Sequence, residues 1–317
     1  MDVLSDALRV LRLSGAVLFT ADFSAPWDVS SPSSALLARV LVPGAGRLVV
    51  FHVITGGECW AEVDGESRIQ LKSGDVVVFP YGDAHVMGWA DGAKRISVTE
   101  LLPMPPWPEP PHLCCGGGGM MTNLVCGFLH CDDALFNPLL AALPRLFSVS
   151  TAEGPQARWL DLMVSQSLSE AIGDQPGSDA LVTRLAELLF LDVLRRYIAQ
   201  QETPASGLLA ALQDEQIARA LEAIHAAPAE SWTVDRLGRQ IGMSRSSLAS
   251  RFKELLGMPP MHYITRLRLQ EASHLLRDTG ESIAEIARRV GYESEAAFNR
   301  AFKRYVDQPP AAWRKDN

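Results

Sequence analysis

The sequence predicts an α+β protein with two domains: an N-terminal antiparallel β-barrel followed by helices, and a C-terminal all-α domain with two helix-turn-helix units. Three observations favour this fold. One stretch near the C-terminus occurs twice in similar form, residues 35–101 form short β-rich runs separated by Gly and Asp turns, and charge is distributed unevenly. Residues 231–317 hold 15 Lys and Arg against 10 Asp and Glu, whereas residues 1–230 hold 14 against 27.

Length and charge indicate the domain limits. The chain has 317 residues, which is enough for two domains. The polar, Pro-containing segment Glu202–Gly207 predicts a linker at residues 201–210, between domains of residues 1–200 and 211–317. Although the net charge is −8, residues 231–317 carry an excess of cations and are therefore the part suited to bind phosphate groups.

The sequence shows no targeting or membrane segment. No apolar run approaches the ~18 residues that a transmembrane helix needs. Residues 1–11 carry apolar side chains at helical spacing, unlike the apolar region of a signal peptide. We therefore expect a cytoplasmic protein without a membrane partner, in which the five cysteines are thiols.

The N-terminal domain is predicted to be rich in β-strands. Val63 and Glu66 flank an Asp-Gly pair of the kind that closes a β-hairpin. The number and spacing of the β-rich runs are typical of a small antiparallel barrel or jelly roll. These runs are Leu36–Val42, Arg47–Ile54, Cys59–Val63, Ser67–Leu71, Val76–Phe79 and Arg95–Leu101.

Four cysteines follow these strands: Cys114, Cys115, Cys126 and Cys131. The first two precede a run of glycines, and the last two lie around a predicted strand at Asn123–Leu129. Three interpretations remain open: structural residues, thiols that an oxidant converts to a disulfide, or zinc ligands together with His112 or His130. Adjacent cysteines rarely pair with one another, so Cys114 and Cys115 are not expected to form a disulfide.

Helical periodicity follows the strands. It covers Ala157–Ile172 and, most strongly, Asp179–Gln201. The second helix is too apolar to have only one buried stripe. It must therefore pack on the barrel or on another subunit.

The repeated stretch is predicted to form two helix-turn-helix units. Residues 233–253 match residues 282–303, first at an offset of 49 and, after one extra residue in the second turn, at an offset of 50. In each copy a short amphipathic helix is followed by a glycine, Gly242 or Gly291, which can adopt the positive φ of a sharp turn. A second amphipathic helix then begins in each copy.

The second helix of each copy has an outward face suited to a DNA major groove. Ser244 and Ser294 are expected to cap these helices. Small residues beside Arg and Asn allow such a face to approach and hydrogen-bond base edges. The residues predicted to contact DNA are Arg245, Ser246, Ala249, Ser250 and Lys253 in the first helix and Ala296, Asn299, Arg300 and Lys303 in the second.

A long helix is predicted between the two copies. Pro259 and Pro260 suit its first turn, and apolar positions continue to about Asp278. About 19 residues at ~1.5 Å each give a rod of roughly 28 Å. Such a rod can present two helices to successive major grooves, about 34 Å apart on one side of DNA.

This C-terminal domain resembles the DNA-binding domain of the AraC/XylS family of bacterial transcription regulators. The resemblance rests on Ile283–Ser294, Phe298–Lys303 and Pro310–Arg314. It implies two helix-turn-helix units joined by a long helix, double-stranded promoter DNA as the ligand and RNA polymerase as a partner. The residues that fall on contact positions of the family are Ser246, Ala249, Ser250 and Arg300.

Two stretches of the N-terminal domain resemble the paired motifs of cupins. Gly74–His85 has the spacing of the second motif, in which the histidine binds a metal, and Trp89 stands where the family usually has Asn. The residues with the spacing of the first motif are Gly46, His52, Glu58 and Gly65. Ile54 replaces the second histidine of that motif. The resemblance therefore implies a cupin-like barrel with an incomplete metal site.

Two interpretations of this site remain. His52, Glu58 and His85 form a set of two histidines and one carboxylate that is able to hold a divalent metal such as Zn. Alternatively, both histidines are hydrogen-bonded residues of an effector pocket that also includes Trp60. Because one ligand of the family is missing, a cupin enzyme is disfavoured.

Together these features predict a sequence-specific DNA-binding transcription regulator, most simply an activator, and not an enzyme. Its N-terminal domain is expected to sense a small molecule or an oxidant, and its helices are expected to share in forming a homodimer, as the resemblance implies. The alternative is a cupin-type metalloenzyme with a DNA-targeting domain.

Overall fold

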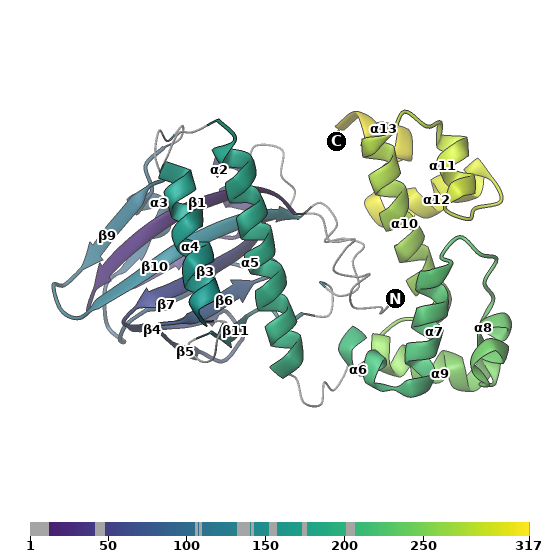
Figure 1. Ribbon diagram of the computed structural model, residues 1–317, viewed down its shortest axis with the longest axis horizontal. Coiled ribbons are helices and arrows are strands. Elements are labelled where there is room, and N and C mark those ends of the chain that lie inside the picture. Colours follow the sequence, from purple (N-terminus) through teal and green to yellow (C-terminus); the bar gives the residue numbers. More distant parts are fainter. Residues whose placement is uncertain are drawn as a thin grey trace. The chain divides into compact units, whose positions relative to one another are not determined.

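The computed structural model describes residues 13–41, 48–104, 107, 110–131, 140, 143–151, 157–172, 176–200 and 207–316 (Figure 1). These residues form two compact units, one rich in strands and the other made of the helices after residue 206. Each unit is described by itself. The predicted N-terminal segment 1–11 and most of the predicted linker, residues 201–206, lie outside the described residues.

The strands of the N-terminal unit are β1 (Leu13–Ser24), β2 (Asp28–Ser31), β3 (Leu48–Gly56), β4 (Glu58–Val63), β5 (Ile69–Lys72), β6 (Asp75–Phe79), β7 (His85–Gly88), β8 (Arg95–Ser97), β9 (His112–Gly116), β10 (Met121–Cys131) and β11 (Phe147–Ser150). Its helices are α2 (Ser34–Leu41), α3 (Val98–Leu101), α4 (Ala157–Ile172) and α5 (Ser178–Gln200).

These strands form two mixed sheets. One has the order β11-β6-β3-β10-β1-β9, and the other has the order β5-β4-β7-β2-β8. Most neighbours are antiparallel, as expected, but β9 runs parallel to β1 and β8 runs parallel to β2. Helix α3 separates β8 from β9 along the chain, and the chain then joins the edge of the other sheet. The predicted all-antiparallel barrel is therefore modified at one edge of each sheet.

The two sheets enclose the core of this unit. Side chains alternate along a strand, so Val50 and Ile54 of β3 face the interior while Val49 and Phe51 face the opposite side. All four are buried, because α5 packs across the outer face of the six-stranded sheet (Figure 1). The sheet is thus covered on both faces, which explains why β3 is an almost continuous apolar run.

The predicted strand at Leu36–Val42 is wrong. The structure has helix α2 at Ser34–Leu41 instead. Ala35, Leu36, Leu37 and Ala38 are strong helix formers, so local propensity outweighs the resemblance of this run to a strand. Strands β1 and β2, which precede α2, were not predicted, and both contribute to the interior.

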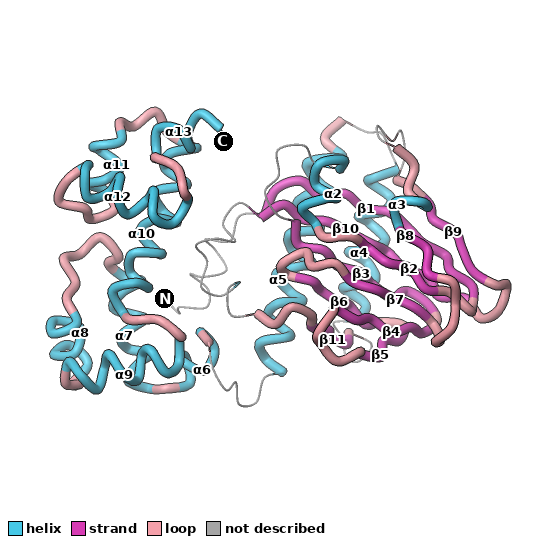
Figure 2. Tube along the Cα trace, turned by 180° about the vertical axis from the view of Figure 1, so that it is seen from behind, coloured by secondary structure: helices cyan, strands magenta, loops and turns pink. Residues whose placement is uncertain are grey.

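The C-terminal unit contains helices α6 (Leu208–Gln213), α7 (Glu215–Ala226), α8 (Val234–Ile241), α9 (Arg245–Leu256), α10 (Pro260–Asp278), α11 (Ile283–Arg289), α12 (Glu295–Val306) and α13 (Pro310–Asp316) (Figure 2). The pairs α8–α9 and α11–α12 are the two predicted helix-turn-helix units. The connecting helix α10 spans the 19 residues that its proline start and apolar spacing predicted.

Each helix-turn-helix unit packs around apolar side chains at helical spacing. Leu248 and Phe252 of α9 are fully buried, as are Phe298 and Phe302 of α12. The rings of Phe302 and Trp313 meet with centroids 5.9 Å apart, so α13 closes the second core. Equivalent positions in the two copies therefore form equivalent cores.

Candidate DNA-binding surface and effector pocket

The turn and cap of each helix-turn-helix unit follow from its sequence. Gly242 and Gly291 have φ of 76° and 86°, a left-handed conformation that favours glycine. The hydroxyl of Ser244 accepts a hydrogen bond from the Ser247 N–H at 3.1 Å, and the hydroxyl of Ser294 accepts one from the Ala297 N–H at 3.2 Å. Both recognition helices, α9 and α12, are thus capped as predicted.

The predicted contact residues share one side of each recognition helix. With the inward residues buried, those on the outward side are exposed or partly exposed. At an offset of 50, Ser250 of α9 corresponds to Arg300 of α12, and Lys253 corresponds to Lys303. Helix geometry places such positions on the same side of both helices. The outward set is Ser246, Ala249, Ser250 and Lys253 in α9 and Ala296, Asn299, Arg300 and Lys303 in α12.

Arg245 lies at the start of α9 and is exposed. Its Nη1 is 3.3 Å from a carboxylate oxygen of Asp235 in α8. An exposed pair of this kind is weak and salt-sensitive. The guanidinium can therefore exchange Asp235 for a DNA phosphate at small cost.

Arg268 of α10 links the two helix-turn-helix units. Its Nε donates to the Pro228 carbonyl at 2.8 Å, and its Nη2 donates to the Glu230 carbonyl at 2.7 Å, both in the loop before α8. Its Nη1 donates to the Gly291 carbonyl at 2.9 Å, in the turn of the second unit. Partial burial lowers the pKa of this guanidinium, which nevertheless stays far above neutral pH. One side chain therefore ties the loop before α8 and the turn of the second unit to the long helix.

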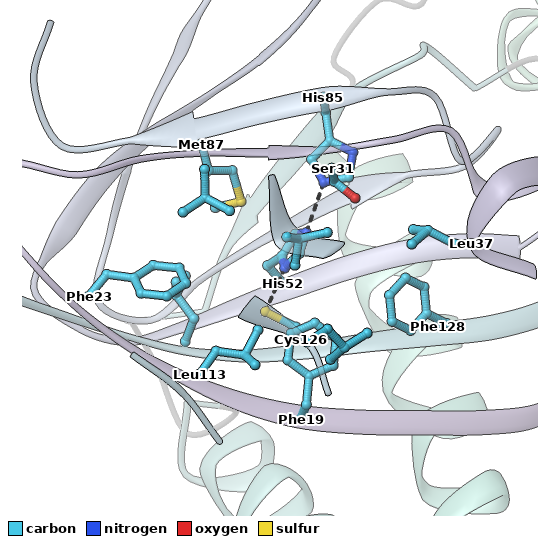
Figure 3. Close-up of a pocket in the computed structure, with 14 residues that line it drawn as sticks. Phe19, Phe23, Ser31, Leu37, His52, His85, Met87, Leu113, Cys126 and Phe128 are labelled. Atoms are coloured by element: carbon cyan, nitrogen blue, oxygen red, sulfur yellow. Dashed lines mark hydrogen bonds between the residues drawn. The ribbon is translucent and has the colours of Figure 1, made fainter. Parts of the chain in front are cut away.

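The interior of the N-terminal unit contains a mainly apolar cavity (Figure 3). The space among its lining atoms is about 530 Å³, a volume that includes open solvent at its mouth. Its lining residues are Phe19, Phe23, Val29, Ser31, Leu37, His52, His85, Met87, Val98, Leu102, Leu113, Leu124, Cys126 and Phe128. His52 and His85, from the two cupin-like motifs, are thus brought together at one site.

The two histidines form a chain of hydrogen bonds (Figure 3). Nδ1 of His85 lies 2.9 Å from the Asp83 carbonyl, so it must carry the proton and donate. Nε2 of His85 is then an acceptor, for the Nε2–H of His52 at 3.2 Å. Nδ1 of His52 accepts from the Cys126 thiol at 2.8 Å. The contacts therefore assign one tautomer to each neutral ring.

Burial reinforces these protonation states. It lowers the pKa of His52 well below its usual value, with a further contribution from His85, and it lowers the pKa of His85 to about 4. Burial also raises the pKa of the Cys126 thiol. At neutral pH the hydrogen-bonded groups from the Asp83 backbone carbonyl through the two imidazoles to the Cys126 thiol are therefore uncharged.

Glu58 and Trp60 do not join this site. Because β4 directs Cys59 and Ala61 into the core, Glu58 and Trp60 point to the opposite face. Trp60 lies beneath the guanidinium of Arg68, whose Cζ is 3.7 Å from the ring centroid. The prediction that both residues line the pocket is therefore wrong.

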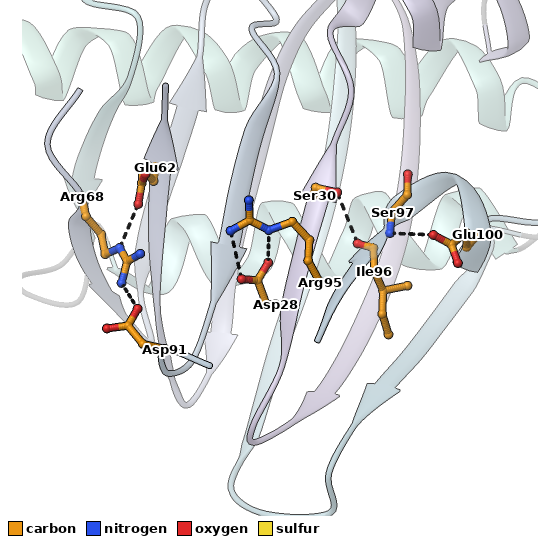
Figure 4. Close-up of polar contacts among 9 residues, drawn as sticks. All are labelled: Asp28, Ser30, Glu62, Arg68, Asp91, Arg95, Ile96, Ser97 and Glu100. Carbon is orange, nitrogen blue, oxygen red and sulfur yellow. Dashed lines mark hydrogen bonds and ion pairs between the residues drawn. The ribbon is translucent and has the colours of Figure 1, made fainter. Parts of the chain in front are cut away.

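The outer face of the five-stranded sheet is polar instead (Figure 4). Arg68 pairs with Glu62 and Asp91, and the Nε of Arg95 donates to Asp28 at 2.8 Å. These pairs cross the strands on the side away from the cavity. They show why a carboxylate on this face of β4 cannot reach His52 or His85.

The residues present do not fit a metal site with three protein ligands. Within the described part of the chain, no group of three or more His, Cys, Asp or Glu side chains is placed to hold a metal ion. The predicted metal ligands His52, Glu58 and His85 do not lie together at one site. The metal centre on which the metalloenzyme alternative depended is therefore not formed by these residues. The two histidines satisfy each other by hydrogen bonding.

The described cysteines occupy different environments. Cys59 and Cys126 are buried, and Cys126 lines the cavity, whereas Cys114 is exposed on β9 and Cys115 is half-buried. Strand β1 lies between β9 and β10, so Cys114 and Cys126 are separated by at least two strand spacings, about 9.6 Å, which is too far for a disulfide. Burial raises the pKa of Cys115 to about 11, the opposite of a reactive thiolate. The side chain of Cys131 lies outside the described residues.

Three important residues were missing from the sequence-based predictions. Ser31 and Phe19 reach the cavity from β2 and β1, which were not recognised as strands. The alternation of apolar and polar residues from Phe19 to Phe23 was a usable signal for β1. Arg268 gave no signal, since nothing in a single sequence shows which backbone carbonyls an arginine meets.

The described helices include none that is long and apolar enough to cross a membrane.

Comparison with known proteins places both units in described families. Residues 2–199 match the cupin family, and residues 237–316 match the helix-turn-helix domain family. A helix-turn-helix-type transcriptional regulator of Haemophilus influenzae is 30% identical over 316 residues, which are 99% of each chain. The regulator AlkR of Acinetobacter baylyi is 32% identical over 273 residues, 85% of this chain and 88% of AlkR.

Among solved structures, an AraC-type DNA-binding domain from Chromobacterium violaceum is 28% identical, with a TM-score of 0.31. The matched region spans 33% of this chain and 94% of the Chromobacterium violaceum domain. The full-length relatives are transcription regulators and not enzymes. The repeated helix-turn-helix unit, the cupin match and the full-length similarity lead to one conclusion: the chain belongs to the AraC-type transcription regulators with an N-terminal cupin domain.

Proposed function

We propose that this regulator binds DNA through the outward faces of α9 and α12 and is controlled by a small molecule held in the cavity of its cupin domain. The observation that carries the proposal is the correspondence of exposed residues between the two recognition helices at a constant offset of 50. A repeated recognition surface suits two successive major grooves. The mainly apolar cavity supports a ligand-controlled rather than constitutive regulator.

The two recognition helices are expected to contribute unequally. Helix α12 offers Arg300 and Asn299 at positions where α9 has Ser250 and Ala249. Arg can hydrogen-bond guanine through two donors and Asn can do so with adenine, whereas Ser and Ala provide less discrimination. Helix α12 is therefore proposed to provide most of the sequence discrimination.

Arg300→Ala is expected to weaken specific DNA binding by about 1–3 kcal/mol at fixed salt, because an exposed guanidinium on the outward face of α12 is lost. Binding isotherms measured by fluorescence anisotropy at fixed ionic strength give this difference. Arg219→Ala is the matched control, since Arg219 is an exposed arginine of α7, outside both recognition helices and outside α4 and α5. Equal affinities of the Arg300 variant and the control would contradict the placement of α12 against DNA.

Helices α4 and α5 support a homodimer as the functional form. They carry large apolar side chains on their exposed sides, including Leu162 at 68% and Leu188 at 51% exposure. A second copy is the partner that we propose for this surface, since two half-sites and cyclic dimers commonly occur together. In this arrangement ligand binding shifts the population of dimer geometries and thereby the affinity for promoter DNA.

Leu188→Glu is expected to convert the dimer to a monomer, because a carboxylate would have to be desolvated in an apolar contact. Sedimentation equilibrium of the full chain measures the mass. Glu187→Gln is the control, because Glu187 is adjacent to Leu188 in the chain but pairs with Arg184 within α5. An unchanged mass for the Leu188 variant would exclude this face as the interface.

A further inference from the structure

The polar groups that line the cavity of the cupin domain form one row, with apolar side chains on both sides (Figure 3). This polar row consists of Ser31, His85, His52 and Cys126, and the other lining residues are apolar. None of the described lining residues is Lys, Arg, Asp or Glu. An ionised ligand group would therefore be buried without a counter-ion, which is strongly unfavourable.

Neither histidine of the polar row has a ring nitrogen free to hydrogen-bond a ligand. Both ring nitrogens of His52 are occupied, one by the Cys126 thiol and one by His85. Both ring nitrogens of His85 are likewise occupied, by His52 and by the Asp83 carbonyl. A ligand could therefore hydrogen-bond to either imidazole only by breaking one of these existing hydrogen bonds.

Ser31 supplies the free polar group. It pairs with His85 across strands β2 and β7, so its side chain lies on the same inner face. The structure shows no hydrogen bond from its hydroxyl to any described residue, and the hydroxyl lines the cavity. It is able both to donate and to accept one hydrogen bond to a ligand.

Two leucines lie between the cavity and a depression on the surface. Leu37 of α2 and Leu102, just after α3, line both the cavity and a neighbouring surface depression. The depression is otherwise formed by Pro32, Leu36, Ser97, Thr99, Pro103 and Met104. Its rim exposes large apolar side chains, with Leu36 at 55% and Met104 at 78%. The cavity and this apolar surface depression therefore adjoin at the two leucines.

We propose that this cavity binds an uncharged, mainly apolar molecule that presents one hydroxyl or carbonyl group to Ser31 and extends its apolar part outward between Leu37 and Leu102. The inference rests on the proposed function and specifies its ligand. A neutral hydrogen-bonding group of the ligand suits the uncharged polar row. An apolar chain or ring of the ligand suits the other lining residues and the apolar surface depression beside them.

A homologous series of 1-alkanols with six to ten carbons tests this inference against carboxylates of the same lengths. Isothermal titration calorimetry with the full chain is expected to show saturable binding of the alkanols. Their affinity should rise with chain length, because each buried methylene adds to the transfer free energy. Carboxylates should bind at least about 10-fold more weakly, since their charge must be desolvated.

Two adjacent serines provide a matched pair of variants. Ser31 faces the cavity, whereas the neighbouring Ser30 donates to the Ile96 carbonyl on the other side of β2 (Figure 4). Ser31→Ala should weaken alkanol binding by about 3- to 10-fold, the usual contribution of one hydrogen bond. Ser30→Ala should leave alkanol affinity unchanged. Circular dichroism confirms that both variants are folded.

Three results would overturn the inference: no saturable binding of any alkanol, carboxylates that bind as tightly as alkanols, or equal effects of the two serine variants. Such a failure is distinguishable from failure of the proposed function. DNA binding measured in parallel on the same protein reports on the recognition helices alone. Retained DNA binding without alkanol binding would reject the ligand class and leave the DNA-binding role standing.

Discussion

Arg268→Ala is expected to lower the unfolding free energy of the C-terminal unit by about 2–4 kcal/mol, since three backbone carbonyls lose a charged donor. These carbonyls belong to Pro228 and Glu230 before α8 and to Gly291 after α11. The side chain is partly buried, so water replaces only some of the lost hydrogen bonds. Urea denaturation followed by circular dichroism measures the difference.

Two further variants make the test specific. Arg268→Lys keeps the charge but cannot reproduce the planar fork, so it should recover only part of the loss. Arg304→Ala removes an exposed arginine of α12 and should change stability by less than about 0.5 kcal/mol. Equal stability of the Arg268 and Arg304 alanine variants would contradict the role of Arg268 in joining the two helix-turn-helix units.

Gly291→Ala is expected to be much more destabilising than Gly242→Ala, although both glycines occupy the same turn of the repeat. Both have positive φ, so alanine costs about 1–2 kcal/mol at either position. At Gly242 a new Cβ would meet no atom within 4 Å. At Gly291 it would lie 2.3 Å from the Ala229 carbonyl oxygen, which adds about 1–3 kcal/mol of overpacking.

The comparison uses one unit of the repeat as the control for the other. Thermal and urea unfolding of the two variants under identical conditions give the difference in stability. Gly291→Ala should also impair DNA binding more than Gly242→Ala, because Ala229 must move and the position of α12 depends on this contact. Equal losses of stability would contradict the close approach of the Gly291 turn to Ala229 in the loop before α8.

The C-terminal unit could be predicted closely from the sequence because its signals are local and occur twice. Prolines, serine caps and left-handed glycines mark the helix ends, and apolar residues at helical spacing mark the buried faces. The start of α10 at Pro260 and its end at Asp278 follow from these signals. The contact that Arg268 makes between the two helix-turn-helix units joins residues far apart in the chain. The pattern of apolar, capping and turn residues gives no sign of it.

The N-terminal unit was less predictable because strand pairing is not local. The alternation of β4 was visible in the sequence, yet the family motif placed Glu58 beside the histidines when β4 turns it outward. His52 and His85 were correctly expected near one another, since their spacing follows the cupin motifs. Ser31 was missed because β2 is four residues long and pairs with a strand far along the chain.

The most direct test of the central claim is selection of DNA sites from a random duplex pool by the full chain, followed by footprinting of the selected sites. We expect two preferred base blocks about one helical turn, or ~34 Å, apart on one side of the duplex. Arg300→Ala should relax the base preference in one block and leave the other unchanged. Enrichment of no sequence, or of a single block unaffected by Arg300→Ala, would contradict this expectation.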